Sequence, residues 1–233
     1  MIIKSQLYWL FYDIILLGSD TLKQFLDSIR KEESNNTLKR KIINTLFIFI
    51  FGILLGLFSK WLDNIALDNN IWWHNIIEKL DLGNFFSEMA IWLFIALTIS
   101  IYSTSPKRAS INVFIFFVGM NISYHLYTIF FSGFNPRSYM IVWYTLTLIS
   151  PFLAYICWYS KSKNKISIII NSIIIFIMLS FCFSIGMWYF DLRGILYTLT
   201  FIATILTTYN DLKITSISFI IGLVMSFIIR ISN

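Results

Sequence analysis

The sequence predicts an all-α fold: a polytopic bundle of about seven transmembrane helices, preceded by N-terminal amphipathic or interfacial helices. Composition and spacing both indicate this class. Hydrophobic residues make up 58% of the 233 residues and charged residues only 13%, and the mean hydropathy is +0.74. Soluble domains have about 45–50% apolar and about 25% charged residues. The charges also lie between long apolar runs, so we expect membrane spans rather than separate soluble domains.

Two domains are expected, an N-terminal cytoplasmic-side segment over 1–41 and a transmembrane bundle over 42–233. Residues 5–18 are apolar. A span needs about 20 apolar residues, so we expect an interfacial or re-entrant helix there and leave open whether it crosses.

A second N-terminal helix is predicted from the spacing of its apolar residues. Leu22, Phe25, Leu26 and Ile29 recur at i, i+3, i+4 and i+7, with charged residues between them. Such a stripe is typical of an amphipathic helix. It would lie on a membrane surface or on the inner rim of the protein, and an ordinary solvated helix is the alternative.

Seven apolar segments are the predicted spans. They are residues 42–60, 85–104, 110–131, 139–159, 166–190, 194–209 and 214–230. The last two are short and joined by "NDLK". They would form a tight helical hairpin, or a pair that does not fully cross the membrane.

The basic residues predict the orientation. With the N-terminus in the cytoplasm, thirteen of the 18 Lys and Arg residues lie on the inner side, as positively charged loops prefer. These are Lys4, Lys23, Arg30, Lys31, Lys39, Arg40, Lys41, Lys107, Arg108, Lys161, Lys163, Lys165 and Lys213. They form no stripe with interleaved aromatic residues, so the net charge of +6 indicates the lipid bilayer as partner and not nucleic acid.

The long outer loop between the first two spans is expected to cap the outer mouth of the bundle. Trp72 and Trp73 suit a short helix at the membrane interface. His74 and Glu78 are spaced i, i+4, with Asp81 beyond. Two ligands and a distant carboxylate are weak evidence for a metal, so no metal site is predicted.

Small residues four apart predict where helices pack closely in lipid. The first span has Gly52 and Gly56, and the last has Ser218, Gly222 and Ser226.

Pro151 should kink the fourth span. It leaves the carbonyl of Thr147 without its helical partner, and a neighbouring serine or a ligand could satisfy that carbonyl.

The polar face of the third span is the main functional candidate. Asn121, Tyr124, His125 and Thr128 lie at i, i+3, i+4 and i+7. Unsatisfied polar groups in hydrocarbon cost several kcal/mol, so this face should point into the bundle. Two interpretations stay open: an interhelical hydrogen-bond cluster, or the wall of an outward-facing cavity with His125 as a ligand-binding or proton-responsive group.

Other candidate ligand-binding residues surround the predicted outer mouth. Arg137 follows the third span, and Trp143 lies one turn inside the start of the fourth span. Glu88 and Trp92 lie four apart near the outer end of the second span. Glu88 would pair with Lys60 or Arg137, or extend outward to water. Such a set would suit an anionic or aromatic ligand.

No catalytic residues and no cofactor are predicted. HExxH, GxSxG and P-loop motifs are missing from the sequence. The leading hypothesis is a small-molecule binding or transport component with an outward-facing polar and aromatic pocket. The alternatives are a membrane interaction protein that binds a membrane-protein partner (a sensor, immunity protein or accessory subunit), with a structural polar cluster, and an intramembrane enzyme of unrecognised type.

Three stretches carry a resemblance to known proteins. They are "FGILLGLFSKWLDN" (51–64), "YSTSPKRASINVFIFFVGMNISYHLY" (102–127) and "FNPRSYMIVWYTLTLISPFLAYICWY" (134–159). The chain resembles a family of uncharacterised small polytopic membrane proteins of clostridia and related Gram-positive bacteria, which has no assigned activity. The resemblance implies a bacterial cytoplasmic membrane and transfers no functional residue.

Overall fold

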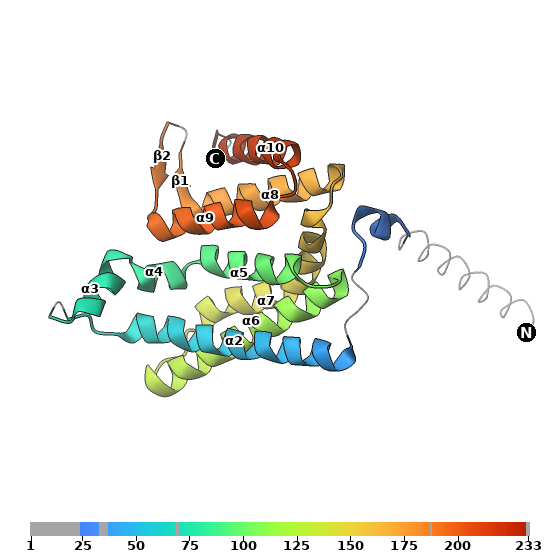
Figure 1. The fold of residues 1–233 in the computed structure, drawn as a ribbon. Helices are drawn as coiled ribbons and strands as arrows, with labels where there is room; N and C mark the ends of the chain where they lie inside the picture. Colours follow the sequence, from blue (N-terminus) through green and yellow to red (C-terminus); the bar gives the residue numbers. More distant parts are fainter. Residues whose placement is uncertain (1–23, 33–36, 69, 187, 232–233) are drawn as a thin grey trace, which may run out of the picture.

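The computed structural model describes residues 24–32, 37–68, 70–186 and 188–231, and these form helices joined by short turns, with one small β-hairpin (Figure 1). The elements are α2 (Leu38–Asn64), α3 (Trp72–Lys79), α4 (Leu82–Ser87), α5 (Met89–Ile101), α6 (Pro106–Phe131), α7 (Arg137–Trp158), η1 (Tyr159–Lys161), α8 (Lys165–Cys182), β1 (Phe183–Ile185), β2 (Phe190–Leu192), α9 (Ile195–Thr208) and α10 (Leu212–Ile231). The helix expected over 5–18 lies outside the described residues.

Five helices in the described part are long and apolar enough to cross a membrane: α2, α6, α7 with η1, α8 and α10. The helices α5 and α9 have 13 and 14 residues. At 1.5 Å per residue each measures about 20 Å, less than the roughly 30 Å hydrocarbon core. The helical membrane-protein class is therefore supported by five helices, and crossing by α5 and α9 stays a prediction.

Two predicted spans differ from the structure in detail. The helix expected over 85–104 is interrupted at Glu88, whose backbone is extended between α4 and α5. The helix expected over 166–190 ends at Cys182, and β1 and β2 follow as an antiparallel hairpin. The hairpin is favoured because Phe183 stacks on Phe190 at 5.0 Å and packs edge-on against Phe201 of α9 at 5.1 Å.

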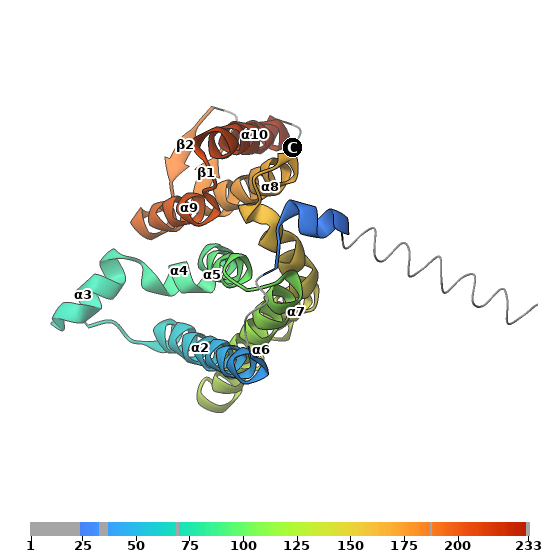
Figure 2. The ribbon, with the colours of Figure 1, turned by 45° about the vertical axis from the view of Figure 1, so that its right-hand side comes forward.

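The helices form two groups with α5 between them. On one side lie α2, α6 and α7, on the other α8, α9 and α10, and α5 contacts α6 and α7 as well as α8 and α9 (Figure 2). We call the end with the start of α2 and the turns after α5, α7 and α9 the basic end. The end with α3, α4 and the β-hairpin is the capped end.

Glycines bring α2 and α6 into backbone contact, which confirms the small-residue prediction for the first span. A Cβ atom on Gly52 would collide with the Phe116 carbonyl oxygen, and one on Gly56 with that of Met120. Gly119 is equally tight from the α6 side. Without a side chain at these positions, the two helices gain van der Waals contact along their length.

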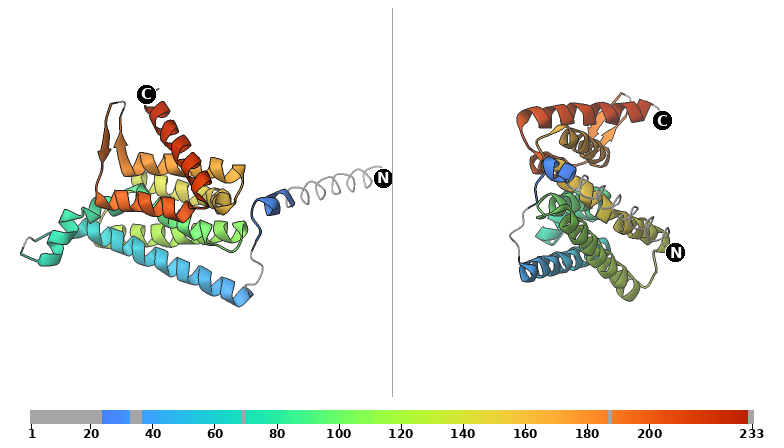
Figure 3. Two further views of the ribbon diagram at one scale, coloured as in Figure 1. Left: turned by 45° about the horizontal axis from the view of Figure 1, so that its top comes forward. Right: turned by 90° about the vertical axis from the view of Figure 1, so that its right-hand side faces the viewer.

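The last span packs on α8 through its predicted small residues. A Cβ atom on Gly222 would lie 2.9 Å from the Ser172 carbonyl oxygen, and Ser218 donates to the Ile168 carbonyl at 3.3 Å. Figure 3 shows α10 crossing α8 obliquely. The expected α9–α10 hairpin is joined by a tight turn, but α9 packs mainly against α5 and α8, and α10 against α8.

Pro151 lies within α7, and a neighbouring serine satisfies the carbonyl that it frees. Ser150 donates its hydroxyl to the Thr147 carbonyl at 2.8 Å, and Ser110 of α6 donates to the Pro151 carbonyl at 2.7 Å. This agrees with the structural alternative for Pro151 rather than with a ligand site.

The described part of the N-terminal segment lies on the rim of the bundle at the basic end. Residues 24–29 are helical, Ile29 is buried and Phe25 is exposed. Arg30 donates to the carbonyls of Trp158 and Ile101, at the ends of α7 and α5, and its guanidinium lies 4.1 Å from the Trp158 ring. Both carbonyls end helices and lack helical partners, so Arg30 ties these ends together.

Candidate binding site at the capped end

Asn121 joins α6 to α7 in the buried interior. Its side chain is 2% exposed and donates to the Thr147 hydroxyl at 2.6 Å and to the Trp143 carbonyl at 3.3 Å. Buried amides need such partners, since an unsatisfied one is costly in lipid. The predicted inward direction of Asn121 is therefore confirmed.

A cluster of five residues centred on one carboxylate lies nearer the capped end. Asp63 accepts hydrogen bonds from Tyr124 and Ser87, each at 2.9 Å, and its carboxylate lies 3.5 Å from the Lys60 ammonium. Tyr139 donates to the Ser87 carbonyl at 3.4 Å. We call Lys60, Asp63, Ser87, Tyr124 and Tyr139 the Asp63 cluster. It links α2, α4, α6 and α7.

Lys60 is the buried cation of the Asp63 cluster. The residue is 5% exposed, and its ammonium lies 5.4 Å from the centre of the Tyr124 ring and 5.6 Å from that of Phe134. Aromatic faces stabilise a desolvated cation, but a buried charge still requires a counter-ion. Asp63, one turn later on α2, provides it.

His125 faces α7 and the loop that precedes it. Its Nε2 lies 3.0 Å from the Asn135 side-chain oxygen and its Nδ1 lies 2.5 Å from the Tyr144 hydroxyl. An amide oxygen only accepts, so Nε2 carries the proton and Nδ1 accepts from Tyr144 in the neutral ring. Thr128 is buried and donates to the Tyr124 carbonyl at 2.8 Å within α6.

Four of the predicted site residues line one small cavity between α5, α6 and α7: Trp92, Asn121, Tyr124 and Trp143. Ser59 of α2 and Tyr139 of α7 also line it. The cavity has a volume of about 10 Å³, enough for one water molecule. Trp92 and Trp143 meet edge to face at 6.2 Å, so most of the wall is aromatic.

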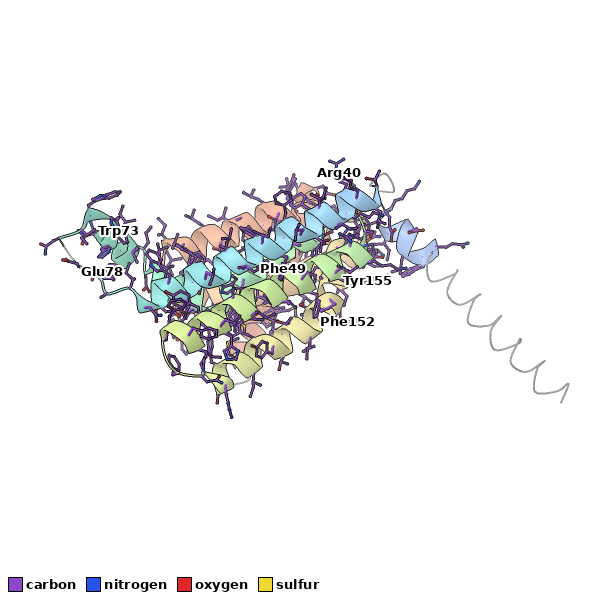
Figure 4. The ribbon with its side chains drawn as sticks, turned by 90° about the horizontal axis from the view of Figure 1, so that it is seen from below. Arg40, Phe49, Trp73, Glu78, Phe152 and Tyr155 are labelled. Carbon is purple, nitrogen blue, oxygen red and sulfur yellow. The ribbon has the colours of Figure 1, made fainter. Side chains whose placement is uncertain are left out.

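A larger cleft lies outside this cavity, beneath α3 and α4. Its volume is about 380 Å³, and Asp63, Glu78, Asp81 and Ser87 line it together with apolar residues. Figure 4 shows Glu78 on α3 at this end of the molecule. Asp63 and Ser87 line the cleft, whereas their hydroxyl partners Tyr124 and Tyr139 line the small cavity. The hydrogen bonds of the Asp63 cluster therefore join residues of the cleft to residues of the small cavity.

Two charged residues of the predicted site lie outside both spaces. Glu88 pairs with Arg193 through both carboxylate oxygens, at 2.7 and 2.8 Å, and not with Lys60 or Arg137. Arg193 precedes α9 and also donates to the Phe181 carbonyl at 3.0 Å. Arg137 is exposed at the start of α7 and lines neither space.

A third space, of about 320 Å³, is a crevice between α5, α7 and α8 in the apolar part of the bundle. Its polar side chains are already bonded: Ser100 donates to the Ala154 carbonyl and Ser150 to that of Thr147. Leu153 and Ile173 at its margin are 43% and 44% exposed. Such a wall suits a lipid chain and provides no specific recognition, so we assign no site to it.

The role of Asp63 and the contribution of Ser59 and Tyr139 were not predicted from the sequence. Asp63 lies one turn after Lys60 on α2 and pairs with it at 3.5 Å. The hydroxyls that Asp63 accepts come from residues 24 and 61 positions further on, and no local pattern links them. One signal was available: Asp63 and Tyr124 lie at the same predicted end of adjacent spans.

Comparison of the chain with known protein families, with curated proteins and with solved structures finds no match. In the described residues, no three His, Cys, Asp or Glu side chains gather as metal ligands. His74 instead accepts a hydrogen bond from the Asp68 backbone at 2.8 Å and fixes the loop before α3.

Proposed function

We propose that this chain is a multi-pass protein of a bacterial cytoplasmic membrane that binds a small ligand from the capped end, as the binding or transport component of a larger process. In this proposal the structure is the closed state. One observation supports it most: four side chains predicted as ligand-binding line a single cavity, and hydrogen bonds of the Asp63 cluster join residues of that cavity to residues of a cleft of ligand size.

The size and composition of the two spaces agree with a ligand site. The cleft of about 380 Å³ falls in the range of roughly 300–1,000 Å³ that small-molecule sites occupy. Opening would break the bonds from Tyr124 to Asp63 and from Tyr139 to Ser87. The bond to the Ser87 carbonyl is worth about 0.5–1.5 kcal/mol net and the bond to the Asp63 carboxylate about 1.5–3 kcal/mol, a cost that binding of a small molecule can offset.

The charge of the cleft favours a ligand with a positive charge or an aromatic ring. Glu78 and Asp81 line the cleft, and Trp92 and Trp143 line the cavity beyond it. Carboxylates attract a cation, and tryptophan faces stabilise it after desolvation. The expectation of an anionic ligand depended on Arg137. Arg137 lines neither space, so an anionic ligand is not favoured.

The capped end faces outward in this proposal. The orientation follows from the thirteen basic residues assigned to the inner side, since positively charged loops stay in the cytoplasm. The resemblance to small clostridial membrane proteins supports a bacterial cytoplasmic membrane.

Protection of an introduced cysteine tests ligand binding. Ser59 lines the small cavity and is 1% exposed, so Ser59→Cys is nearly isosteric there. The background carries Tyr124→Phe and Tyr139→Phe to open the cluster, and Ala at Cys157 and Cys182. We expect tetramethylammonium to slow maleimide labelling of position 59 several-fold. Neopentyl alcohol, a neutral molecule of similar shape, should not. Equal effects of both probes, or none, would contradict a cation site.

The same polar face, interpreted as a structural hydrogen-bond cluster, favours a second function, that of a membrane interaction protein. The Asn121 amide nitrogen bonds across to α7, and the adjacent cavity has room for only about one water molecule. A sensor, immunity protein or accessory subunit that binds a membrane-protein partner would need nothing more from these residues. This alternative predicts that position 59 stays unlabelled in every background and that a membrane partner co-purifies.

A further inference from the structure

A separate cleft lies at the basic end, between α2, α5 and the start of α6, and the capped-end site does not involve it. Its volume is about 290 Å³, and its polar wall includes Lys41, Asn44, Arg108 and Asn112. No carboxylate lies within ion-pair distance of Lys41 or Arg108 among the residues that the structure describes. The cleft therefore contains two positive charges and no counter-charge from these residues.

Arg108 is held in place through one of its nitrogens. Its Nη2 donates to the Lys41 carbonyl at 2.8 Å, to the Asn112 side-chain oxygen at 3.2 Å and to the Thr45 hydroxyl. Asn112 is fixed in turn, since it donates to Ser103 at 3.1 Å. Within the described chain, Nη1 and Nε of Arg108 have no acceptor. Nε and Nη1 can each donate to an oxyanion, but in different directions, because each parallel pair of guanidinium donors includes Nη2.

Two helix N-termini add positive potential at the same end. α2 begins at Leu38 and α6 at Pro106. Thr37 and Ser105 cap the N–H groups of Arg40 and Arg108, and the dipoles of the two helices favour an anion nearby. The C-terminus of α5 has the opposite effect, but its terminal carbonyl, that of Ile101, already accepts from Arg30. The remaining field at the cleft favours negative charge.

Part of the wall of the cleft is apolar. Phe47, Ile48 and Ile99 line it together with the cations, and Phe47 is 68% exposed on the surface of α2. Six residues separate Lys41 from Phe47, about 9 Å along the helix. The cleft thus places cationic groups at the end of the bundle and apolar side chains toward the membrane interior, which matches a phosphate headgroup and its acyl chains.

We infer that this cleft binds the phosphate group of an anionic phospholipid, with the fixed guanidinium of Arg108 as a charged donor and Lys41 as a second cation. Free phosphate shares the headgroup chemistry, but the apolar wall would leave part of the cleft unused. Basic clefts of this kind between membrane helices bind anionic headgroups on the cytoplasmic side, where the basic end would lie in our proposed orientation.

The test measures lipid binding to the purified full chain by native mass spectrometry, with phosphatidylglycerol, phosphatidylcholine and inorganic phosphate as probes. We expect Arg108→Gln to weaken phosphatidylglycerol binding about tenfold, because bonds from a charged group to phosphate are lost. Arg40→Gln removes the same charge from an exposed position on α2 that does not line the cleft (Figure 4). It should change binding less than twofold, and phosphatidylcholine binding should not depend on either residue.

Three results would overturn the inference. Equal losses in the two variants would indicate general surface charge. Equal binding of the two lipids would exclude headgroup recognition, and displacement of phosphatidylglycerol by millimolar phosphate would assign the cleft to the free ion. If Arg108→Gln does not fold, Arg108→Lys decides the question. It keeps the charge but loses the fixed, planar donors of the guanidinium, and retention of full binding would then contradict the proposed role of the Arg108 guanidinium.

Discussion

Asp63 is the residue at the centre of the Asp63 cluster at the capped end. The side chain of Asp63 is 18% exposed, whereas the residue as a whole, backbone included, is exposed at the end of α2. It accepts from Tyr124 and Ser87 and balances the buried Lys60. Its two oxygens thus satisfy groups from three helices, and loss of the charge should affect all of them.

Replacement of Asp63 by Asn tests this role through stability. The amide keeps the shape but leaves Lys60 buried without a counter-charge, so we expect a loss of about 2–3 kcal/mol in the free energy of unfolding. Denaturant unfolding in mixed micelles measures it. Asp191→Asn, in the exposed strand β2, is the matched control and should change little. Lys60→Met in the Asp63→Asn background should recover most of the loss. Unchanged stability of Asp63→Asn alone would disprove the role.

For the helices and the hairpin, sequence patterns predicted those features that depend on residues close together in the chain. The face that pairs Gly52 with Gly56 was visible because the helical repeat places them together and lipid favours close packing. The β-hairpin was not predictable, since it depends on Phe183 meeting Phe201 of another helix. The interruption at Glu88 likewise occurs beside an ion pair with a residue 105 positions away.

The close contact between α2 and α6 predicts that one added methyl group at the contact lowers the stability of the protein. A Cβ atom on Gly56 would collide with the Met120 carbonyl oxygen and the Ser123 hydroxyl, so Gly56→Ala must separate the helices. We expect a loss of about 1–3 kcal/mol in unfolding free energy, the usual cost of overpacking. Gly83→Ala is the control, because its Cβ atom would meet only the Leu62 carbonyl oxygen at 3.9 Å. Similar effects of the two substitutions would contradict the close packing.

For the whole molecule, the inward direction of the polar helical face was the most predictable property, and the geometry of the site was the least predictable. Four of the predicted binding residues line one cavity, because a helical face converges on neighbouring helices. Glu88, His125, Thr128 and Arg137 do not join them. Glu88 pairs with Arg193 before α9, and His125 bonds to Tyr144 and to Asn135 in the loop before α7. The Asp63 cluster depends on four helices meeting at one end, and no single segment of sequence encodes that arrangement.

The orientation of the whole molecule predicts which end impermeant reagents reach. Lys79 is exposed on α3 at the capped end, and Lys107 is exposed at the start of α6 at the basic end. In intact cells, a charged maleimide should label Lys79→Cys and should label Lys107→Cys only after the membrane is permeabilised. The opposite pattern would reverse the proposed orientation.

The labelling rate of Ser59→Cys, in a chain with Ala at Cys157 and Cys182, tests the central claim that the Asp63 cluster closes a cavity lined by the predicted residues. With both tyrosine hydroxyls present, we predict slow labelling, and with Tyr124→Phe and Tyr139→Phe an increase of several-fold. Ser226→Cys is the control, because Ser226 is 3% exposed and lines neither capped-end space. It should stay slow in both backgrounds. Equal rates at position 59 with and without the two hydroxyls would contradict the account.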